Sequence, residues 1–277
     1  MTDIKELLEK HNIRTNKSLG QNFLYKKDII ENIAEYASGG KYALEIGAGP
    51  GVLSRELCKR FEKVATVEID RGLAPVTEEI LGGCANHTMI YADFLKTDIQ
   101  EIIRRCLGEP PVTVVGNLPY NITGDIITKL IKNHSFFDRA VIMIQKEAAQ
   151  KLSAAPSDGC YRAISVLTQY FCDVIPLFDV SPDCFIPAPH VTSSVISMNF
   201  KSRLLLPREK ESGFIAFIHR VFSQRRKLIT SVFQSADEKE KVRNALKALG
   251  FPEKSRGEQL TPAELAEMYN LLYCEQK

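Results

Sequence analysis

The chain has 277 residues and a formal net charge of +2, and 44% of its residues are hydrophobic. This length suits one large domain, or one domain with a small appendage, and the composition is sufficient for a proper core. No run approaches the ~18 apolar residues of a membrane span, and the first residues lack the apolar segment of a secretory signal, so we expect a cytoplasmic protein.

The cysteine spacing and the distribution of charge limit the kinds of site that we expect. Seven cysteines occur without a C-x-x-C pair or a closely spaced Cys/His set, so we expect reduced thiols and no metal site. Residues 201–260 hold 14 Lys/Arg against 7 Asp/Glu, a charge of +7 that leaves −5 for the rest of the chain. This split favours a late segment that faces a polyanion, although a solvated helical surface gives the same pattern.

The N-terminal part predicts a short amphipathic helix over residues 3–10 and a loop over residues 17–24. That loop combines a glycine, two amides and an aromatic residue with basic neighbours, which is typical of a loop that covers a ligand. A helix is predicted to follow Asp28 and to end at Gly39-Gly40.

A strand over residues 42–46 leads into the glycine-rich loop 47–51, and a helix is predicted from about Val52 to Arg60. Glycines let the backbone approach a ligand closely. The third glycine comes one residue too early for the dinucleotide pattern G-x-G-x-x-G. With Glu45 ahead of it, the loop reads E-x-G-x-G-x-G, which resembles the S-adenosylmethionine loop of class I methyltransferases.

The next two strands, residues 63–69 and 88–91, each end in a carboxylate. Glu68 stands where a ribose diol of a bound nucleoside would lie, and Asp70 on the same side of the strand is an alternative that could instead cap the next helix. Asp93 could accept a hydrogen bond from an adenine amino group, or it could be a turn or cap residue.

The fourth strand, residues 112–115, runs directly into Gly116-Asn117-Leu118-Pro119-Tyr120. This cluster offers an amide that accepts hydrogen bonds, a proline that stiffens the turn, and an aromatic face. Together these groups suit a planar base that carries an amino group.

A helix at 123–132 and a strand at 139–144 continue the alternation, which predicts an α/β fold with a doubly wound, mostly parallel sheet of the class I methyltransferase (Rossmann-like) type. Late strands at 173–180 and 193–200 complete a catalytic domain over residues 1–200. Residues 201–277 are predicted to form a small helical RNA-binding domain. Its Arg225-Arg226-Lys227 group either contacts phosphates or is a solvated face.

Five motifs in the same order resemble the KsgA family, the small-subunit ribosomal RNA adenine dimethyltransferases. They lie at residues 17–24, 45–51, 117–120, 185–191 and 222–227. The resemblance covers nearly the whole chain. It implies transfer of four methyl groups from S-adenosylmethionine to two adjacent adenosines near the 3′ end of small-subunit (16S) rRNA, within an immature 30S-type particle. We also expect a monomer that binds no membrane.

The resemblance assigns a role to each matching position. Contacts to the methyl donor are implied for Asn22, Leu24, Gly47, Gly49, Glu68, Asp93 and Asn117. Contacts to the target adenine are implied for Asn117, Leu118, Pro119, Tyr120 and Phe185, although Phe185 alone would read as a core residue. One departure is the pair Tyr161-Arg162, which stands where the family has tyrosine-glycine.

The expected mechanism requires no metal. The Asn117 side-chain oxygen and the carbonyl of Leu118 or Pro119 accept the two amino hydrogens, and the base stacks on Tyr120 and Phe185. One alternative is a large-subunit rRNA adenine methyltransferase of the antibiotic-resistance type, which has a closely similar cluster. Another is an RNA-binding assembly factor with secondary catalysis. DNA adenine methylation is disfavoured because that class typically reads N-P-P-Y or D-P-P-Y here.

Overall fold

The structure is a computed structural model that describes residues 4–16, 19–225 and 227–273, so Lys17, Ser18 and Arg226 lie outside the described residues. The chain divides into two compact units: residues 1–149 with 174–200, and residues 150–173 with 201–277. The boundary predicted at residue 200 coincides with one limit of the second unit. Residues 150–173, which were predicted within the first domain, lie instead in the second unit.

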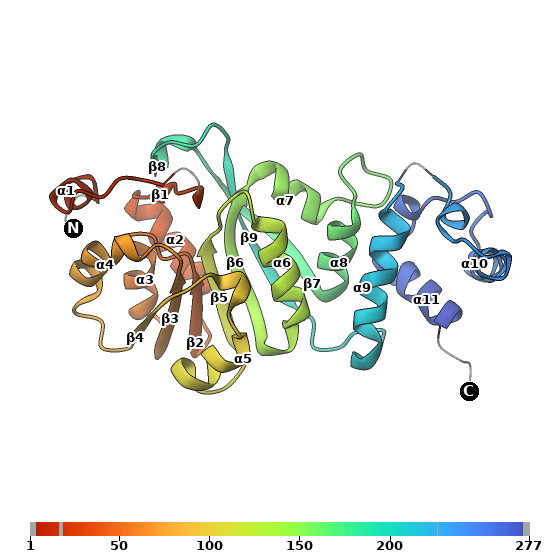
Figure 1. Cartoon of the computed structure of the whole chain (residues 1–277), viewed down its shortest axis with the longest axis horizontal. Coiled ribbons are helices and arrows are strands. Elements are labelled where there is room, and N and C mark those ends of the chain that lie inside the picture. Colours follow the sequence, from red (N-terminus) through yellow and green to blue (C-terminus); the bar gives the residue numbers. More distant parts are fainter. Residues whose placement is uncertain (1–3, 17–18, 226, 274–277) are drawn as a thin grey trace. The chain divides into compact units, whose positions relative to one another are not determined.

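The first unit contains a seven-stranded sheet with the order β4-β3-β2-β5-β6-β9-β7 (Figure 1). The strands are β2 (Tyr42–Ile46), β3 (Lys63–Glu68), β4 (His87–Tyr91), β5 (Val112–Asn117), β6 (Phe137–Gln145), β7 (Cys172–Val180) and β9 (Ser193–Phe200). Strands β2 to β6 pair in parallel, and β9 pairs antiparallel with β6. The predicted doubly wound, mostly parallel sheet is therefore confirmed.

Helices connect the parallel strands, because parallel neighbours need a crossover rather than a hairpin. They are α3 (Val52–Cys58), α4 (Ala74–Leu81), α5 (Ile99–Ile102) and α6 (Thr123–Lys132). Helices α1 (Ile4–Lys10) and α2 (Lys27–Ala37) precede β2, and α7 (Lys146–Ser153) follows β6. Every residue of β2 is buried, as expected of a central strand covered on both faces. The carboxyl ends of β2, β3, β4 and β5 consequently meet at one edge of the sheet.

A second, two-stranded sheet was not predicted. Strand β1 (Phe23–Leu24) pairs antiparallel with β8 (Phe185–Ile186), and Leu24 lies opposite Phe185. The N-terminal segment is also held at α4, where Lys10 Nζ lies 2.8 Å from Glu79 Oε1. These contacts fix the segment that carries Asn22 and Leu24.

The second unit is helical, with α8 (Ala163–Phe171), α9 (Arg208–Phe222), α10 (Ala236–Ala248) and α11 (Pro262–Tyr273). Its core is aromatic, and the Tyr170 and Phe214 rings lie 4.5 Å apart between centroids. Tyr161 is fully buried and donates its hydroxyl to Leu260 O at 3.0 Å. The neighbouring Arg162 donates to Gly159 O at 2.6 Å. Among the described residues, no helix combines the length and the apolarity that a bilayer crossing requires.

Candidate active site

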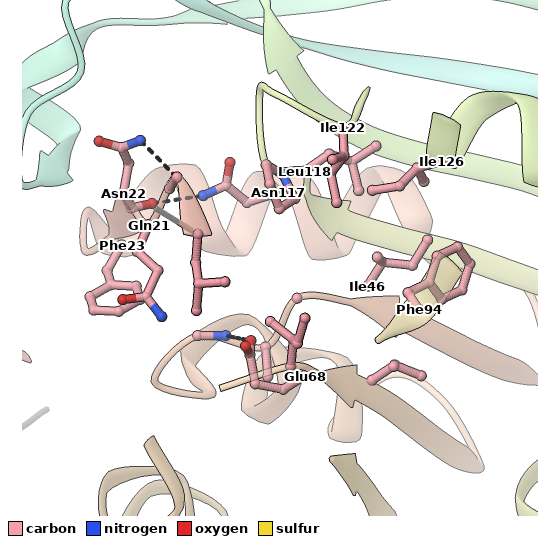
Figure 2. Close-up of a pocket in the computed structure, with 18 of the residues that line it drawn as sticks. Gln21, Asn22, Phe23, Ile46, Glu68, Phe94, Asn117, Leu118, Ile122 and Ile126 are labelled. Atoms are coloured by element: carbon pink, nitrogen blue, oxygen red, sulfur yellow. Dashed lines mark hydrogen bonds between the residues drawn. The ribbon is translucent and has the colours of Figure 1, made fainter. Parts of the chain in front are cut away.

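A pocket lies at the edge where the parallel strands end, with Gln21, Asn22 and Phe23 of the N-terminal segment on one side of it (Figure 2). The space between its lining residues is about 960 Å³, open solvent at its mouth included. Its walls include all but one of the unit's predicted ligand and substrate residues: Asn22, Leu24, Gly47, Gly49, Glu68, Asp93, Asn117, Leu118, Pro119 and Tyr120. Four strand ends and one loop therefore converge on one cavity.

The glycine-rich loop after β2 forms the floor of this pocket. Gly47, Gly49 and Gly51 have φ angles of +77°, +52° and +93°, which residues with a side chain adopt only with strain. A Cβ atom on Gly49 would also lie 3.1 Å from the Phe23 ring. Glycine at position 49 thus lets the Phe23 ring pack directly against the backbone of the loop, which a side chain there would prevent.

Glu68, at the end of β3, faces the pocket while Asp70 does not. The Glu68 carboxylate accepts from Gly49 N at 2.9 Å and from Asp70 N at 2.8 Å. Burial raises the pKa of Glu68, and the two backbone donors oppose that shift. Asp70 caps the next turn by accepting from Gly72 N at 2.9 Å. A carboxylate has about four acceptor positions, so Glu68 keeps capacity for further hydrogen bonds.

Asp93 has the cap role that was one of its two predicted roles, and it also lies in the pocket wall. Its Oδ1 accepts from Leu95 N at 2.9 Å, so the side chain caps a short turn, and the residue also lines the pocket. Phe94 follows it, buried, and lies at the same end of the pocket as Ile46 and Ile126 (Figure 2). This end of the cavity is apolar with one carboxylate at its edge, which fits a purine ring with an exocyclic amino group.

Asn117 is oriented by the N-terminal segment. Its side-chain Nδ2 donates to Asn22 O at 2.9 Å (Figure 2). A backbone carbonyl can only accept, so the amide nitrogen must face Asn22, and the Asn117 Oδ1 points away from it. The acceptor oxygen of the amide is thereby left for a ligand.

The carbonyl groups of Leu118 and Pro119 differ in the hydrogen bonds that they accept. Pro119 O accepts from Thr123 Oγ1 at 2.9 Å and from Ile122 N at 3.3 Å, in the first turn of α6. Among the described residues no donor binds Leu118 O, while Leu118 N donates to Met143 O at 3.0 Å. Of the two carbonyls that the sequence left open, Leu118 O is the better placed acceptor.

The two aromatic residues expected to hold a base are placed differently. Tyr120 lines the pocket, and its hydroxyl lies 2.7 Å from Ser193 Oγ, which anchors the ring; burial raises the pKa of this hydroxyl. Phe185 is 3% exposed and packs in the hydrophobic core rather than in the pocket wall. The structure thus gives Phe185 the core position that its pattern alone suggested. It remains tied to the site through its pairing with Leu24.

Arg225 and Lys227, two of the three basic residues predicted to contact phosphates, differ in their surroundings. Arg225 forms an ion pair with Glu258, with Nε and Oε2 2.5 Å apart, and donates to Asp158 O at 3.1 Å. Arg226 lies outside the described residues, and Lys227 is exposed. Arg225 is therefore held by partners inside its own unit, whereas the Lys227 side chain is exposed.

Sequence reasoning missed two residues that shape the site. Gln21 Nε2 donates to Asp70 Oδ2 at 2.6 Å, which ties the N-terminal segment to the end of β3. Lys129 on α6 donates to carbonyls of the turn that follows Asp93. Gln21 lies in the loop that was predicted to cover a ligand, but the sequence did not indicate its hydrogen-bond partner. Lys129 carried no signal, because lysines on helices usually face solvent.

Comparison with known proteins agrees with this geometry. A family model for ribosomal RNA adenine dimethylase matches residues 12–273. The chain is 36% identical to ribosomal RNA small subunit methyltransferase A of Clostridioides difficile (strain 630), over 97% of this chain and 94% of the relative. It is 36% identical to the protein of the same name from Alkaliphilus oremlandii (strain OhILAs), over 97% of this chain and 95% of that relative.

Two solved structures share the fold. A dimethyladenosine transferase from Plasmodium falciparum superposes with a TM-score of 0.72 at 23% identity, covering 89% of this chain and 95% of the other. The 23S rRNA methyltransferase ErmE superposes with a TM-score of 0.68 at 26% identity, covering 91% and 99%. Both confirm the predicted class I methyltransferase fold. With a family model matched over most of its length, the chain belongs to the ribosomal RNA adenine dimethylase family.

Proposed function

We propose that this protein dimethylates the amino nitrogens of two adjacent adenosines near the 3′ end of small-subunit (16S) rRNA, with S-adenosylmethionine as methyl donor. Family membership and the names of the relatives support an rRNA adenine substrate. The observation that carries the chemistry is the orientation of Asn117, whose amide nitrogen is occupied by Asn22 O and whose oxygen is left to accept.

The pocket fits the proposed methyl donor in shape and in donor set. Gly47 and Gly49 line the pocket, Glu68 offers acceptors for a ribose diol, and the apolar end with Asp93 at its edge suits an adenine ring. When bound, S-adenosylmethionine supplies an electrophilic methyl group on a positively charged sulfur. Every further step depends on how this chain's own residues prepare the acceptor nitrogen.

The acceptor nitrogen is a poor nucleophile because its lone pair is delocalised into the adenine ring. In the proposed mechanism Asn117 Oδ1 and Leu118 O accept its two hydrogens, which draws the nitrogen toward a tetrahedral shape and directs its lone pair out of the ring plane. Tyr120 holds the base by stacking, which contributes ~1–3 kcal/mol per base. The methylated nitrogen is strongly acidic and releases its proton, so this scheme needs no tuned histidine.

Recognition of the RNA is proposed to involve the second unit, with Lys227 as one phosphate contact. The excess of Lys/Arg in residues 201–260 supports this assignment, because basic surfaces bind nucleic acids through their phosphates. We further propose that the protein acts in the cytoplasm as a monomer on an immature small subunit. These proposals on compartment, oligomeric state and substrate particle go beyond the family assignment.

The test is to incubate the purified protein and isotopically labelled S-adenosylmethionine with small and large ribosomal subunits that lack the modification. Mass spectrometry of nuclease fragments then locates the methyl groups. Label in two adjacent dimethyladenosines of the small-subunit RNA is expected. Label in large-subunit RNA instead would reverse the substrate assignment in favour of the antibiotic-resistance type. Binding of small subunits without label would favour an assembly factor.

A further inference from the structure

Lys129 links the two halves of the active site. It lies on α6, which begins directly after the Asn117–Tyr120 cluster. Its ammonium group donates to Phe94 O and to Thr97 O, each at 2.5 Å, and lies 3.4 Å from Thr97 Oγ1. The same nitrogen lies 4.9 Å from the centre of the Phe94 ring. An ammonium has three N–H donors, so these oxygens account for its hydrogen-bonding capacity.

The oxygens that Lys129 binds belong to the short turn at residues 93–97 (the 93–97 turn). Asp93 begins this turn by accepting from Leu95 N, and Thr97 Oγ1 closes it by donating to Phe94 O at 2.7 Å. Phe94 O also accepts from Thr97 N at 3.2 Å, within the turn, and the ammonium of Lys129 adds a charged donor to it and to Thr97 O at the end of the turn. Lys129 therefore determines where the end of the turn sits, and with it Asp93 and Phe94.

Helix α6 also contacts the other side of the pocket, where the Asn117–Tyr120 cluster lies. Ile122 and Ile126 line the pocket one turn apart, and Lys129 follows Ile126 by three residues, on the same side of α6. Thr123 Oγ1 donates to Pro119 O and fixes the start of this helix to the cluster. A displacement of the 93–97 turn would thus separate the Asp93 edge of the pocket from the Asn117 edge.

Burial and nearby carboxylates act on the charge of Lys129 in opposite directions. Burial lowers the pKa of Lys129, and the carboxylates of Asp93 and Asp98 act against that shift. Lys96 lies 3.5 Å from Asp93 Oδ2, but it is exposed and does not reach the turn's carbonyls in the contacts described. Lys132, one turn further along α6, is also exposed. Among these lysines, Lys129 is the one held against the pocket wall.

We propose that Lys129 is a positioning residue for recognition of the donor's purine: by binding the carbonyls of Phe94 and Thr97 it holds Asp93 where it accepts from the exocyclic amino group. This inference rests on the proposed function, because it takes the bound ligand to be an adenosyl compound. Its consequence is specific. Loss of the amine should weaken binding of the adenine derivative, and it should erase the preference for adenine over a purine that lacks the amino group.

The test measures binding of two thioethers by calorimetry: S-adenosylhomocysteine, and the analogue in which an unsubstituted purine replaces adenine. Wild type should prefer the adenine compound, because a site that hydrogen-bonds a group rejects a ligand without it. Lys129→Met keeps the length of the side chain and removes the charge. It should bind S-adenosylhomocysteine at least ~10-fold more weakly, since hydrogen bonds to charged groups are strong, and it should bind both compounds about equally.

Lys132→Met is the matched control and should behave as wild type, and Lys129→Arg should restore most of the preference because it retains a cation. If Lys129→Met binds both thioethers as wild type does, or loses affinity equally for both, Lys129 has no positioning role. If Lys129→Met does not fold, the comparison of Lys129→Arg with Lys129→Gln decides the question in the same way. Failure of wild type to bind S-adenosylhomocysteine would overturn the proposed function itself.

Discussion

Replacement of Asn117 by alanine should abolish methyl transfer while leaving donor binding largely intact. The change removes Oδ1, the proposed acceptor of an amino hydrogen, and it also removes the Nδ2 bond to Asn22 O. Loss of one preorganised transition-state hydrogen bond typically lowers kcat by ~10²–10³. The lost bond to Asn22 O has a net value of about 1 kcal/mol, so donor affinity should fall only ~5-fold.

The two functions of the amide can be separated with a second variant. Asn117→Asp keeps an acceptor oxygen but places the other oxygen opposite the Asn22 carbonyl, so transfer should fall less than in Asn117→Ala and donor affinity at least as much. Single-turnover transfer to small subunits gives the rate, and calorimetry with S-adenosylhomocysteine gives the affinity. Asn121→Ala, an exposed neighbour, is the control. An Asn117→Ala rate within tenfold of wild type would refute the assigned role.

The remaining predictions concern pH, stacking and RNA. Burial raises the pKa of Glu45 to about 7, so folding binds its proton; this stabilisation, up to ~3 kcal/mol, is complete below pH ~4.5 and is lost as pH rises through 7. Glu45→Gln should therefore flatten the fall in melting temperature between pH 4.5 and 7.5, and an unchanged fall would exclude Glu45 as its source. Tyr120→Ala should raise the KM for RNA by ~5–150-fold and Tyr120→Phe much less, whereas equal effects would place the contribution in the hydroxyl bound to Ser193. Arg225→Ala should lower the melting temperature through loss of its ion pair, while Lys227→Ala should reduce the slope of log K against log salt by ~1; a slope left at the wild-type value would make Lys227 a solvated residue.

The parallel sheet could be predicted because the apolar runs in the sequence show where its strands begin and end. Residues 42–46 and 193–200 are strands in the structure with the limits that their apolar runs indicated. The β1 and β8 pairing could not be predicted, because two residues are too few to show a period and their partner is far away in the chain. The placement of residues 150–173 in the second unit escaped for a related reason: an amphipathic helix shows that it needs a partner, without showing which one.

The predicted site residues at strand ends are brought together because parallel strands end at one edge of the sheet. The sequence did not show which of these groups already have hydrogen-bond or ion-pair partners. Both carbonyls after Asn117 were candidates, and only the bonds from Thr123 and Ile122 show that Pro119 O is engaged. The ion pair of Arg225 with Glu258 was likewise not visible in the sequence. Hydrogen-bond partners across long sequence separations carry this information, and no local pattern encodes them.

The choice of an amide at position 117 follows from its two contacts. An acceptor alone could be supplied by aspartate, but a carboxylate would turn one oxygen toward the Asn22 carbonyl and repel it. An amide donates to that carbonyl and so fixes its own oxygen in the opposite direction. Asn22 belongs to the segment that covers the donor pocket, and β1 in the same segment pairs with the strand that holds Phe185. In the proposed mechanism, the segment that lines the donor pocket therefore also orients the oxygen that accepts from the target base.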